Sequence, residues 1–262
     1  MKNSPIILMY HGIKTNSESI PEGREVGAEL YDLPLDRFES QMNWLSANGY
    51  HTGSIEDFNH SDQEKQVILT FDDGEMNNFT RALPILKRLN FKAYFFIIVD
   101  RIGQPGYMGW DELHQLQNAD MMIGSHSLTH PILTDLEDHQ VKQELDDSLQ
   151  CLVNHLGNQV STLSIPRGFC NNKVIQIAYA AGYQNVFISE RPEHLKIDCW
   201  ERIAVKASWH LQRFQMAIDG EKPIGENFAD QAKKIAKKLL KGKTYDHLRS
   251  SLINLKKQVG AK

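Results

Sequence analysis

Two short motifs in this chain bring together residue types that bind metal ions and move protons. The first is Leu69-Thr70-Phe71-Asp72-Asp73-Gly74, and the second, later in the chain, is His126-Ser127-Leu128-Thr129-His130-Pro131. Together they supply a carboxylate suited to a divalent ion, two imidazoles and a second carboxylate. Imidazole and carboxylate ligands with one open coordination position are typical of a catalytic rather than a structural zinc site. The motifs therefore outline a hydrolytic metal site.

Each motif follows a short apolar segment. Residues 67–71 precede the aspartates and have the composition of a strand buried on both faces, and residues 121–124 precede the first histidine. In α/β proteins, ligands and catalytic groups collect at the carboxyl edge of parallel strands, so both motifs should emerge on one rim. The spacing of His126 and His130 predicts a helical turn that presents both imidazoles to one ion.

Each motif is weak by itself. Asp-Gly is a common turn dipeptide, so Asp72-Asp73-Gly74 could simply end a strand. With 11 histidines in the chain, a His-x-x-x-His spacing can also arise by chance. Their joint occurrence, each after an apolar segment, favours the metal site.

At these residues the chain resembles the polysaccharide deacetylases with NodB homology, which form carbohydrate esterase family four. The two motifs match the first and second motifs of that family, and Ser164-Ile165-Pro166-Arg167-Gly168 resembles one form of the third. The resemblance implies a distorted (β/α) barrel and a metal-dependent N-deacetylase acting on N-acetylated sugars, as in bacterial surface-polysaccharide assembly. It also implies that Asp73, His126 and His130 bind the metal ion and that Asp72 is the general base.

The chemistry of the residues agrees with these roles. Neighbouring residues on a strand point to opposite sides, so Asp72 and Asp73 are not expected to chelate one ion together. One carboxylate is thus left to accept a proton from the attacking water. A divalent ion lowers the pKa of bound water towards about 7 and polarises the amide carbonyl. Zinc is the expected ion, with cobalt or nickel as alternatives, because mixed N/O sites follow metal availability as well as affinity.

The third motif departs from the commonest family pattern. Ser164 stands where the family usually has the arginine that orients the base, and an arginine follows the proline instead, as Arg167. We predict that Pro166, Arg167 and Gly168 contribute to the oxyanion site or to substrate contacts. Trp110 follows a glycine-rich segment and is predicted either to stack on a sugar ring or to be a core residue at a helix start.

The general acid is predicted to come from the first strand. The late Leu-x-His motif of the family has no clean match: His210 is nearest, but it opens an amphipathic segment and is predicted to be a cap or surface residue. His11 ends the apolar run 6–10, and the Tyr-His pair resembles that of family members whose first strand supplies the acid. An imidazole ordinarily titrates near pH 6.5, which suits proton donation to a leaving amine. The alternative for His11 is a hydrogen-bonded structural residue.

Alternating strands and helices must position these residues. A chain of 262 residues with 41% apolar residues can form one globular core. Periodicity predicts β/α units. The predicted strands are 6–10, 67–71, 93–99, 121–124, 163–165, 185–188 and 203–205, and the predicted helices are 35–47, 82–89, 110–116, 137–156 and 173–181. Residues 18–33 are predicted to be a loop over the rim.

The predicted domains are a barrel at 1–225 and a basic helical tail at 226–262. Residues 231–262 contain nine Lys and one Arg against a single Asp, although the whole chain carries a net charge of −4. Apolar residues recur there at helical spacing, which predicts two amphipathic helices joined at Gly242. The tail either packs on the barrel or contacts an anionic membrane or a lipid-linked glycan. Nucleic acid binding is not expected, because a base-stacking surface needs more aromatic residues than Tyr245 alone.

Cysteine usage and the amino-terminal segment predict a cytoplasmic enzyme. The basic tail adds the prediction that this enzyme contacts the membrane surface peripherally. Three cysteines without a C-x-x-C pair read as reduced thiols. The first apolar run is too short for a signal-peptide core, and no apolar stretch is long enough to span a membrane. Two alternative functions remain open: a ring-opening amidohydrolase resembling the allantoinase relatives, and an inactive sugar-binding relative.

Overall fold

The computed structural model describes residues 5–15, 21, 24–60, 65–157, 160–221, 244 and 251. The predicted boundary between barrel and tail lies outside these residues, as do the two predicted tail helices apart from Thr244 and Ser251, which are helical. No helix among the described residues is long and apolar enough to cross a membrane.

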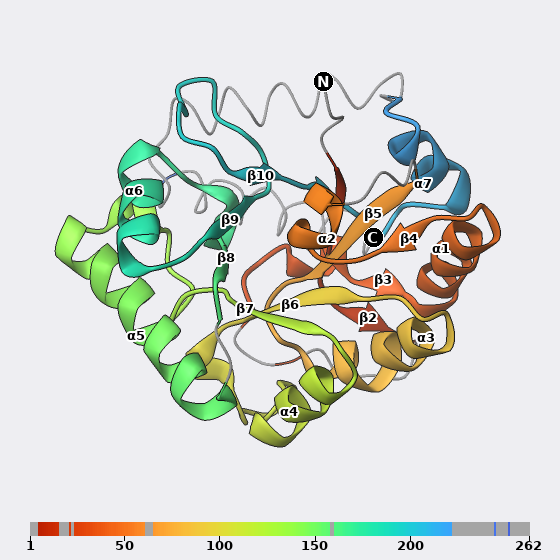
Figure 1. The fold of residues 1–262 in the computed structure, drawn as a ribbon, viewed down its shortest axis with the longest axis horizontal. Coiled ribbons are helices and arrows are strands. Elements are labelled where there is room, and N and C mark those ends of the chain that lie inside the picture. The colour runs from red at the N-terminus through yellow and green to blue at the C-terminus, as the bar shows by residue number, and fades with distance from the viewer. Residues whose placement is uncertain are drawn as a thin grey trace.

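A parallel sheet curls into a barrel at the centre of the molecule (Figure 1). The strand order is β10-β9-β8-β7-β6-β5-β1-β11, and β4 pairs with the start of β5. The bounds are β1 Ile6–Tyr10, β4 His51–Thr52, β5 Gln66–Phe71, β6 Ala93–Ile97, β7 Met122–Ser125, β8 Thr162–Ser164, β9 Asn185–Ile188, β10 Trp200–Glu201 and β11 Ile203–Ala204. A separate two-stranded sheet pairs β2 (Ile13–Lys14) with β3 (Leu33–Pro34).

One short segment closes the barrel. Only Arg202 separates β10 from β11, yet β10 pairs with β9 and β11 pairs with β1. The Arg202 N–H donates to the carbonyl of Ile188, and the Val205 N–H donates to that of Met9. Residues 200–205 therefore join the two ends of the sheet. The sequence predicted a strand at 203–205 and missed β10.

Helices form the outer layer around the strands (Figure 1). The α-helices are α1 Leu35–Ala47, α2 Ile55–His60, α3 Leu83–Arg88, α4 Trp110–Asn118, α5 Asp138–Leu156, α6 Asn172–Ala181 and α7 Leu211–Ile218. Shorter turns are η1 Ala28–Tyr31, η3 Val99–Arg101, η4 Leu133–Asp135 and η5 Pro166–Gly168, and a π-helical turn, η2 Asn78–Ala82, precedes α3. The predicted strands and helices are confirmed with small shifts at their ends. The short elements α2, β2, β3 and β4 were not predicted.

Side chains alternate between the barrel interior and the helix-facing exterior, as the pleat of a strand requires. The interior cluster contains Ile7, Ile68, Tyr94, Phe96 and Phe187. The intervening residues pack under the helices and include Leu8, Leu69, Phe71, Phe95 and Ile97. This burial on both faces explains why the strand sequences are nearly continuous apolar runs.

The same alternation brings polar residues together at the carboxyl end of the barrel. Counting by two along the strands from interior residues leads to Asp72 beyond β5, to His126 beyond β7, to Ser164 in β8 and to Arg202 after β10. All four are buried. The barrel thus ends in a polar interior layer, on the rim where the sequence placed the site.

Candidate active site

Asp73, His126 and His130 form a cluster that can hold one metal ion. One potential ligand atom from each lies within 4.8 Å of the other two, and all three residues are buried. The Asp73 Oδ1 atom lies 3.6 Å from His126 Nε2 and 3.7 Å from His130 Nε2. One carboxylate and two imidazoles fit a divalent ion of the zinc type with positions left for water and substrate. The structure therefore brings together the predicted ligand set.

A tight turn, not a helical turn, brings the two histidines together, so that part of the prediction was wrong. Ser127 and His130 have positive φ angles of 66° and 64°, which an α-helix does not contain. The Ser127 hydroxyl accepts the His130 N–H, and one carboxylate oxygen of Glu144 accepts the N–H groups of Leu128 and Thr129. These contacts hold a backbone that non-glycine residues rarely adopt, as is common at functional sites.

The side chain of Asp73 is directed by a turn rather than by strand alternation, and Asp73 Oδ1 and Asp72 Oδ2 lie 3.6 and 3.8 Å from the same atom, His126 Nε2. That the two carboxylates do not chelate one ion together stays a prediction. Strand β5 ends at Phe71, and Asp73 already lies in a turn with a φ of 77°. Gly74 follows with a φ of 75°, and a side chain there would meet Ile97 at 3.2 Å. The turn directs Asp73 to the imidazoles, while Asp72 continues the interior alternation of the strand.

Both imidazoles are held through Nδ1, which leaves Nε2 towards Asp73. His126 Nδ1 lies 2.8 Å from the carbonyl oxygen of Ser164, and His130 Nδ1 lies 2.7 Å from Oε1 of Glu25. Such partners fix the ring orientation and the tautomer of metal-ligating histidines. Burial and the neighbouring His130 lower the pKa of His126 to about 4, against the opposing effect of the two aspartates. His126 is therefore neutral near pH 7, as a metal ligand must be.

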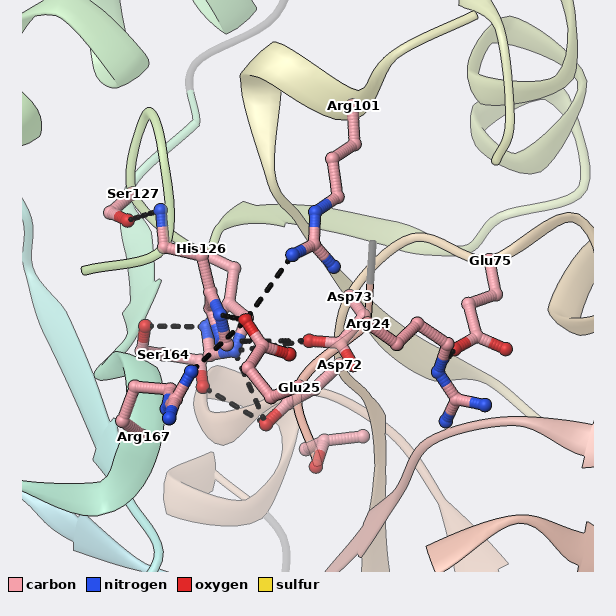
Figure 2. Close-up of polar contacts among 12 residues, drawn as sticks. Arg24, Glu25, Asp72, Asp73, Glu75, Arg101, His126, Ser127, Ser164 and Arg167 are labelled. Carbon is pink, nitrogen blue, oxygen red and sulfur yellow. Dashed lines mark hydrogen bonds and ion pairs between the residues drawn. The ribbon is translucent and has the colours of Figure 1, made fainter. Parts of the chain in front are cut away.

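Arg202 holds the Asp72 carboxylate in a two-pronged ion pair. Arg202 Nη1 lies 2.7 Å from Asp72 Oδ1, and Nη2 lies 2.8 Å from Oδ2. Arg202 Nη2 also donates to the Ser164 hydroxyl at 2.7 Å, and that hydroxyl donates to Asp72 Oδ2 at 3.3 Å. Asp72 Oδ2 lies 3.8 Å from His126 Nε2, so the carboxylate borders the metal cluster (Figure 2).

These contacts keep Asp72 ionised although it is only 2% exposed. Burial alone would raise the pKa of the carboxyl group, but the charge of Arg202 and the Arg202 hydrogen bonds hold that pKa well below its usual range, and His126 lowers it further only when its imidazole is protonated. Arg202 thus faces the base predicted from the sequence. Sequence reasoning missed it, because the predicted strand begins only at residue 203 and β10 was not predicted, so nothing in the sequence placed Arg202 beyond the carboxyl end of a strand.

His11 and His210 lie in different settings. His11 follows β1 at the rim, where Tyr10 aligns with Phe71, and its charge affects the pKa of Asp72. The ring of His11 packs on that of Tyr31 with centroids 5.0 Å apart, and its Nδ1 is buried without a hydrogen-bond partner among the described residues. His210 is an exposed N-cap residue of α7 whose side chain makes no capping hydrogen bond. The catalytic role of His11 stays a prediction.

The third motif forms the turn η5 at the same rim. Arg167 has a φ of 62° and Gly168 a φ of 69°, so Pro166, Arg167 and Gly168 make a sharp turn directly after β8. Arg167 Nη1 lies 3.1 Å from Glu25 Oε1. Trp110 begins α4 and stacks on His155 with centroids 4.0 Å apart. The oxyanion and sugar-contact roles of these four residues stay predictions.

The segment before η1 supplies two further residues that the sequence analysis did not single out. Arg24 lies 2.8 Å from Glu75 Oε1 through Nε and donates to Asp32 Oδ2 at 2.9 Å through Nη1. Its neighbour Glu25 contacts His130, and it also pairs with Arg101 and Arg167, as Figure 2 shows. Burial raises the pKa of Glu75 to about 7, although Arg24 opposes the shift. No strand or motif marks this loop in the sequence, so only its fold reveals its contacts.

Comparisons with known proteins show similarity to polysaccharide deacetylases in sequence. The sequence profile of the family described as "Polysaccharide deacetylase" matches residues 59–186. The Bacillus subtilis protein YxkH, by name a polysaccharide deacetylase, is 31% identical over 68% of this chain and 62% of its own length. The Bacillus subtilis peptidoglycan-N-acetylmuramic acid deacetylase PdaA is 31% identical over 48% of this chain and 48% of its own length. The chain thus spans less than two thirds of the length of these relatives.

The fold is similar to that of solved deacetylases. The Streptococcus pyogenes deacetylase PplD, solved in complex with acetate, superposes with a TM-score of 0.72 at 22% identity, over 85% of this chain and all of that one. BC0361, a polysaccharide deacetylase from Bacillus cereus, superposes with a TM-score of 0.70 at 24% identity, over 82% of this chain and 69% of that one. These similarities confirm the predicted barrel.

Proposed function

We propose that this chain, which matches the polysaccharide deacetylase family in sequence and fold, hydrolyses the N-acetyl group of an N-acetylated sugar to acetate and a free amine. The observation that carries the proposal is the adjacency of two units in one buried layer. One is the ligand set of Asp73, His126 and His130, and the other is the ionised carboxylate of Asp72. Hydrolysis of an unactivated amide needs both a divalent ion and a base.

The ligand set would bind one divalent cation, for which we propose zinc, with cobalt or nickel as alternatives. When bound, such a cation supplies Lewis-acid polarisation of the amide carbonyl and makes water acidic enough to attack near neutral pH. The chain's own residues supply the proton transfers and the orientation of the reacting groups.

Asp72 accepts the proton of the attacking water at a carboxylate oxygen. Its orientation is fixed because Arg202 contacts both oxygens and Ser164 contacts one of them. Arg202 also keeps the carboxylate ionised, so the base is ready at neutral pH, although the same contacts weaken its basicity. The backbone of the Pro166–Gly168 turn is proposed to donate to the developing oxyanion.

His11 is proposed to protonate the leaving amine. It stands on the same rim as Asp72, on the neighbouring strand, and its Nδ1 is not engaged by another described residue. His210 lies exposed at the start of α7, a helix that packs against α1. The rim position of His11 therefore favours it as the acid.

The proposed substrate class is a glycan or glycan precursor that carries N-acetylated hexosamine. The names of two relatives support this class: PdaA acts by name on peptidoglycan N-acetylmuramic acid, and PgdA of Listeria monocytogenes, 30% identical over 62% of this chain, on peptidoglycan N-acetylglucosamine. The basic segment 231–262 is proposed to contact an anionic membrane or a lipid-linked form of the substrate, in a cytoplasmic setting.

Acetate release tests the proposal directly. The zinc-, cobalt- or nickel-loaded protein is incubated with N-acetylglucosamine oligomers, peptidoglycan fragments, nucleotide-linked and lipid-linked N-acetyl sugars, and with a cyclic amide such as allantoin. We expect acetate and a new primary amine from at least one sugar, and release slower by roughly 10²- to 10⁴-fold from the Asp72→Asn variant loaded with the same metal. Ring opening of allantoin without acetate release from any sugar would replace the proposal by the amidohydrolase alternative.

A further inference from the structure

Glu25 lies at the junction of three parts of the rim. Its Oε1 atom lies 2.7 Å from Nδ1 of His130, 3.2 Å from Nη2 of Arg101 and 3.1 Å from Nη1 of Arg167. His130 belongs to the turn after β7, Arg101 to η3 after β6, and Arg167 to η5 after β8. A single carboxylate oxygen thus connects the segments that follow three adjacent strands (Figure 2).

The preceding residue anchors Glu25 in the fold. The Arg24 side chain is 5% exposed and pairs with Asp32 and Glu75, whose side chains are also buried. Gly12 leaves the space for this cluster, because a Cβ atom there would lie 2.7 Å from Asp32 and 2.9 Å from Glu75. Because these buried ion pairs fix Arg24, the next residue, Glu25, has little conformational freedom. The conformation of the loop therefore fixes the contact of Glu25 with His130.

The contact has a chemical consequence for His130. A carboxylate on Nδ1 favours the tautomer with a proton on Nδ1, and this leaves the Nε2 lone pair free to bind a metal ion. In the structure, Nε2 is the atom that faces Asp73, at 3.7 Å. The Nδ1–H tautomer of His126 is favoured in the same way by the carbonyl oxygen of Ser164, which belongs to the backbone of the barrel. His130 instead depends on a side chain from a loop far away in the sequence.

We infer that Glu25 is a positioning residue for the metal site: it sets the tautomer and orientation of His130 and thereby strengthens metal binding. This inference rests on the metal site of the proposed function. Its role differs from that of the two arginines, Arg101 and Arg167, whose ion pairs are with the Glu25 carboxylate. Removing an arginine should leave the His130 contact in place, whereas removing the carboxylate should not.

Two readouts that do not require turnover test the inference. Metal affinity is measured by competition with a chromogenic chelator, with zinc and with cobalt, for the wild type and for Glu25→Leu, Glu25→Gln and Arg101→Gln. The tautomer of His130 is measured in the metal-free proteins from the ring nitrogen and proton shifts in NMR spectra. Thermal unfolding of the metal-free proteins establishes that each variant is folded.

We expect Glu25→Leu to weaken metal binding by about 10- to 100-fold, the usual effect of losing such a partner. Glu25→Gln should weaken metal binding less, because the amide oxygen can still accept a hydrogen bond from the Nδ1–H group of His130. The Arg101→Gln control should bind metal like the wild type. His130 should be an Nδ1–H tautomer in the wild type and a mixture in Glu25→Leu.

Wild-type metal affinity in Glu25→Leu, or an equal loss in Arg101→Gln, would overturn the inference. If Glu25→Leu does not fold, the His130 tautomer in Glu25→Gln and the wild type decides the question, and an Nε2–H tautomer in the wild type would overturn it. Failure of the wild type to bind any divalent ion would overturn the proposed function instead, while the tautomer measurement would still report on Glu25.

Discussion

Replacing Arg202 by glutamine should disable the base without touching the metal ligands. The Asp72 carboxylate is 2% exposed and receives both guanidinium nitrogens at 2.7 and 2.8 Å. Without the guanidinium, a neutral amide faces a buried carboxylate. Burial then raises the pKa of Asp72, because the interior disfavours the charged form and the main opposing charge is gone.

The expected size of the effect follows from these contacts. Breaking a buried ion pair by removing one partner costs about 3–5 kcal/mol of the free energy of unfolding. The loss in kcat is bounded by the whole contribution of a general base, roughly 10²- to 10⁴-fold. The sign of the pH effect is fixed: the base works only when ionised, so a raised pKa moves the acidic limb of the rate profile to higher pH. Part of the lost activity should return in alkaline buffer.

The assay compares pH profiles of kcat/KM for acetate release, metal content and thermal unfolding in the wild type and Arg202→Gln. A double variant, Ser164→Arg with Arg202→Ser, tests the geometry. The Ser164 hydroxyl lies 2.7 Å from Arg202 Nη2 and 3.3 Å from Asp72 Oδ2, so an arginine at 164 can reach the same carboxylate. We expect it to recover part of the activity that Arg202→Ser alone loses. A folded, metal-loaded Arg202→Gln with a wild-type kcat and an unmoved acidic limb would refute the reasoning.

Four further predictions concern the remaining groups of the site. A His126→Ala, His130→Ala double variant should lose the bound metal in elemental analysis, and full occupancy would refute the ligand set. Asp72→Asn should keep the metal and lower kcat by roughly 10²- to 10⁴-fold, since the amide cannot accept a proton. His11→Ala should lower kcat by a similar factor and remove the high-pH limb of the rate profile; an unchanged limb would return the acid role to another residue. For Glu75, burial raises the pKa to about 7, so the metal-free folded protein binds more protons than the unfolded chain below that pH, and its stability should fall as pH rises from 4.5 to 7. Glu75→Gln should flatten this dependence of the unfolding temperature, and an unchanged slope would show that other groups cause it.

The metal ligands could be predicted from the sequence because short-range patterns specify them. A buried strand ending in Asp72-Asp73-Gly74 and a His-x-x-x-His after another apolar run identify both the residues and the rim on which they lie. The backbone that joins the histidines could not be predicted in the same way. Spacing alone does not distinguish a helical turn from a turn with two positive φ angles, and the contacts of Glu144 that hold this turn come from α5.

The residues that support the metal ligands and the base were missed for a different physical reason. Glu25 and Arg202 act through contacts with residues 105 and 130 positions away in the chain. Glu25 lies in a predicted loop, and Arg202 lies before the amino-terminal end of the predicted strand 203–205, so neither position predicts a residue at the carboxyl rim. Their roles appear only when the barrel closes and the loop before η1 is placed over the rim.

Barrel closure also explains how Arg202, from the segment after β10, can form the ion pair with Asp72. The family resemblance suggested an arginine at position 164, in β8, and this chain has a serine there. In a closed barrel, interior residues of one layer converge whatever their order in the chain, and Trp200-Glu201-Arg202 enters that layer between β9 and β1. Ser164 is small enough to leave the space that the Arg202 guanidinium fills, and its hydroxyl hydrogen-bonds to both partners. The serine and the arginine are therefore complementary, and a motif comparison that examines only β8 would wrongly conclude that the base lacks its cation.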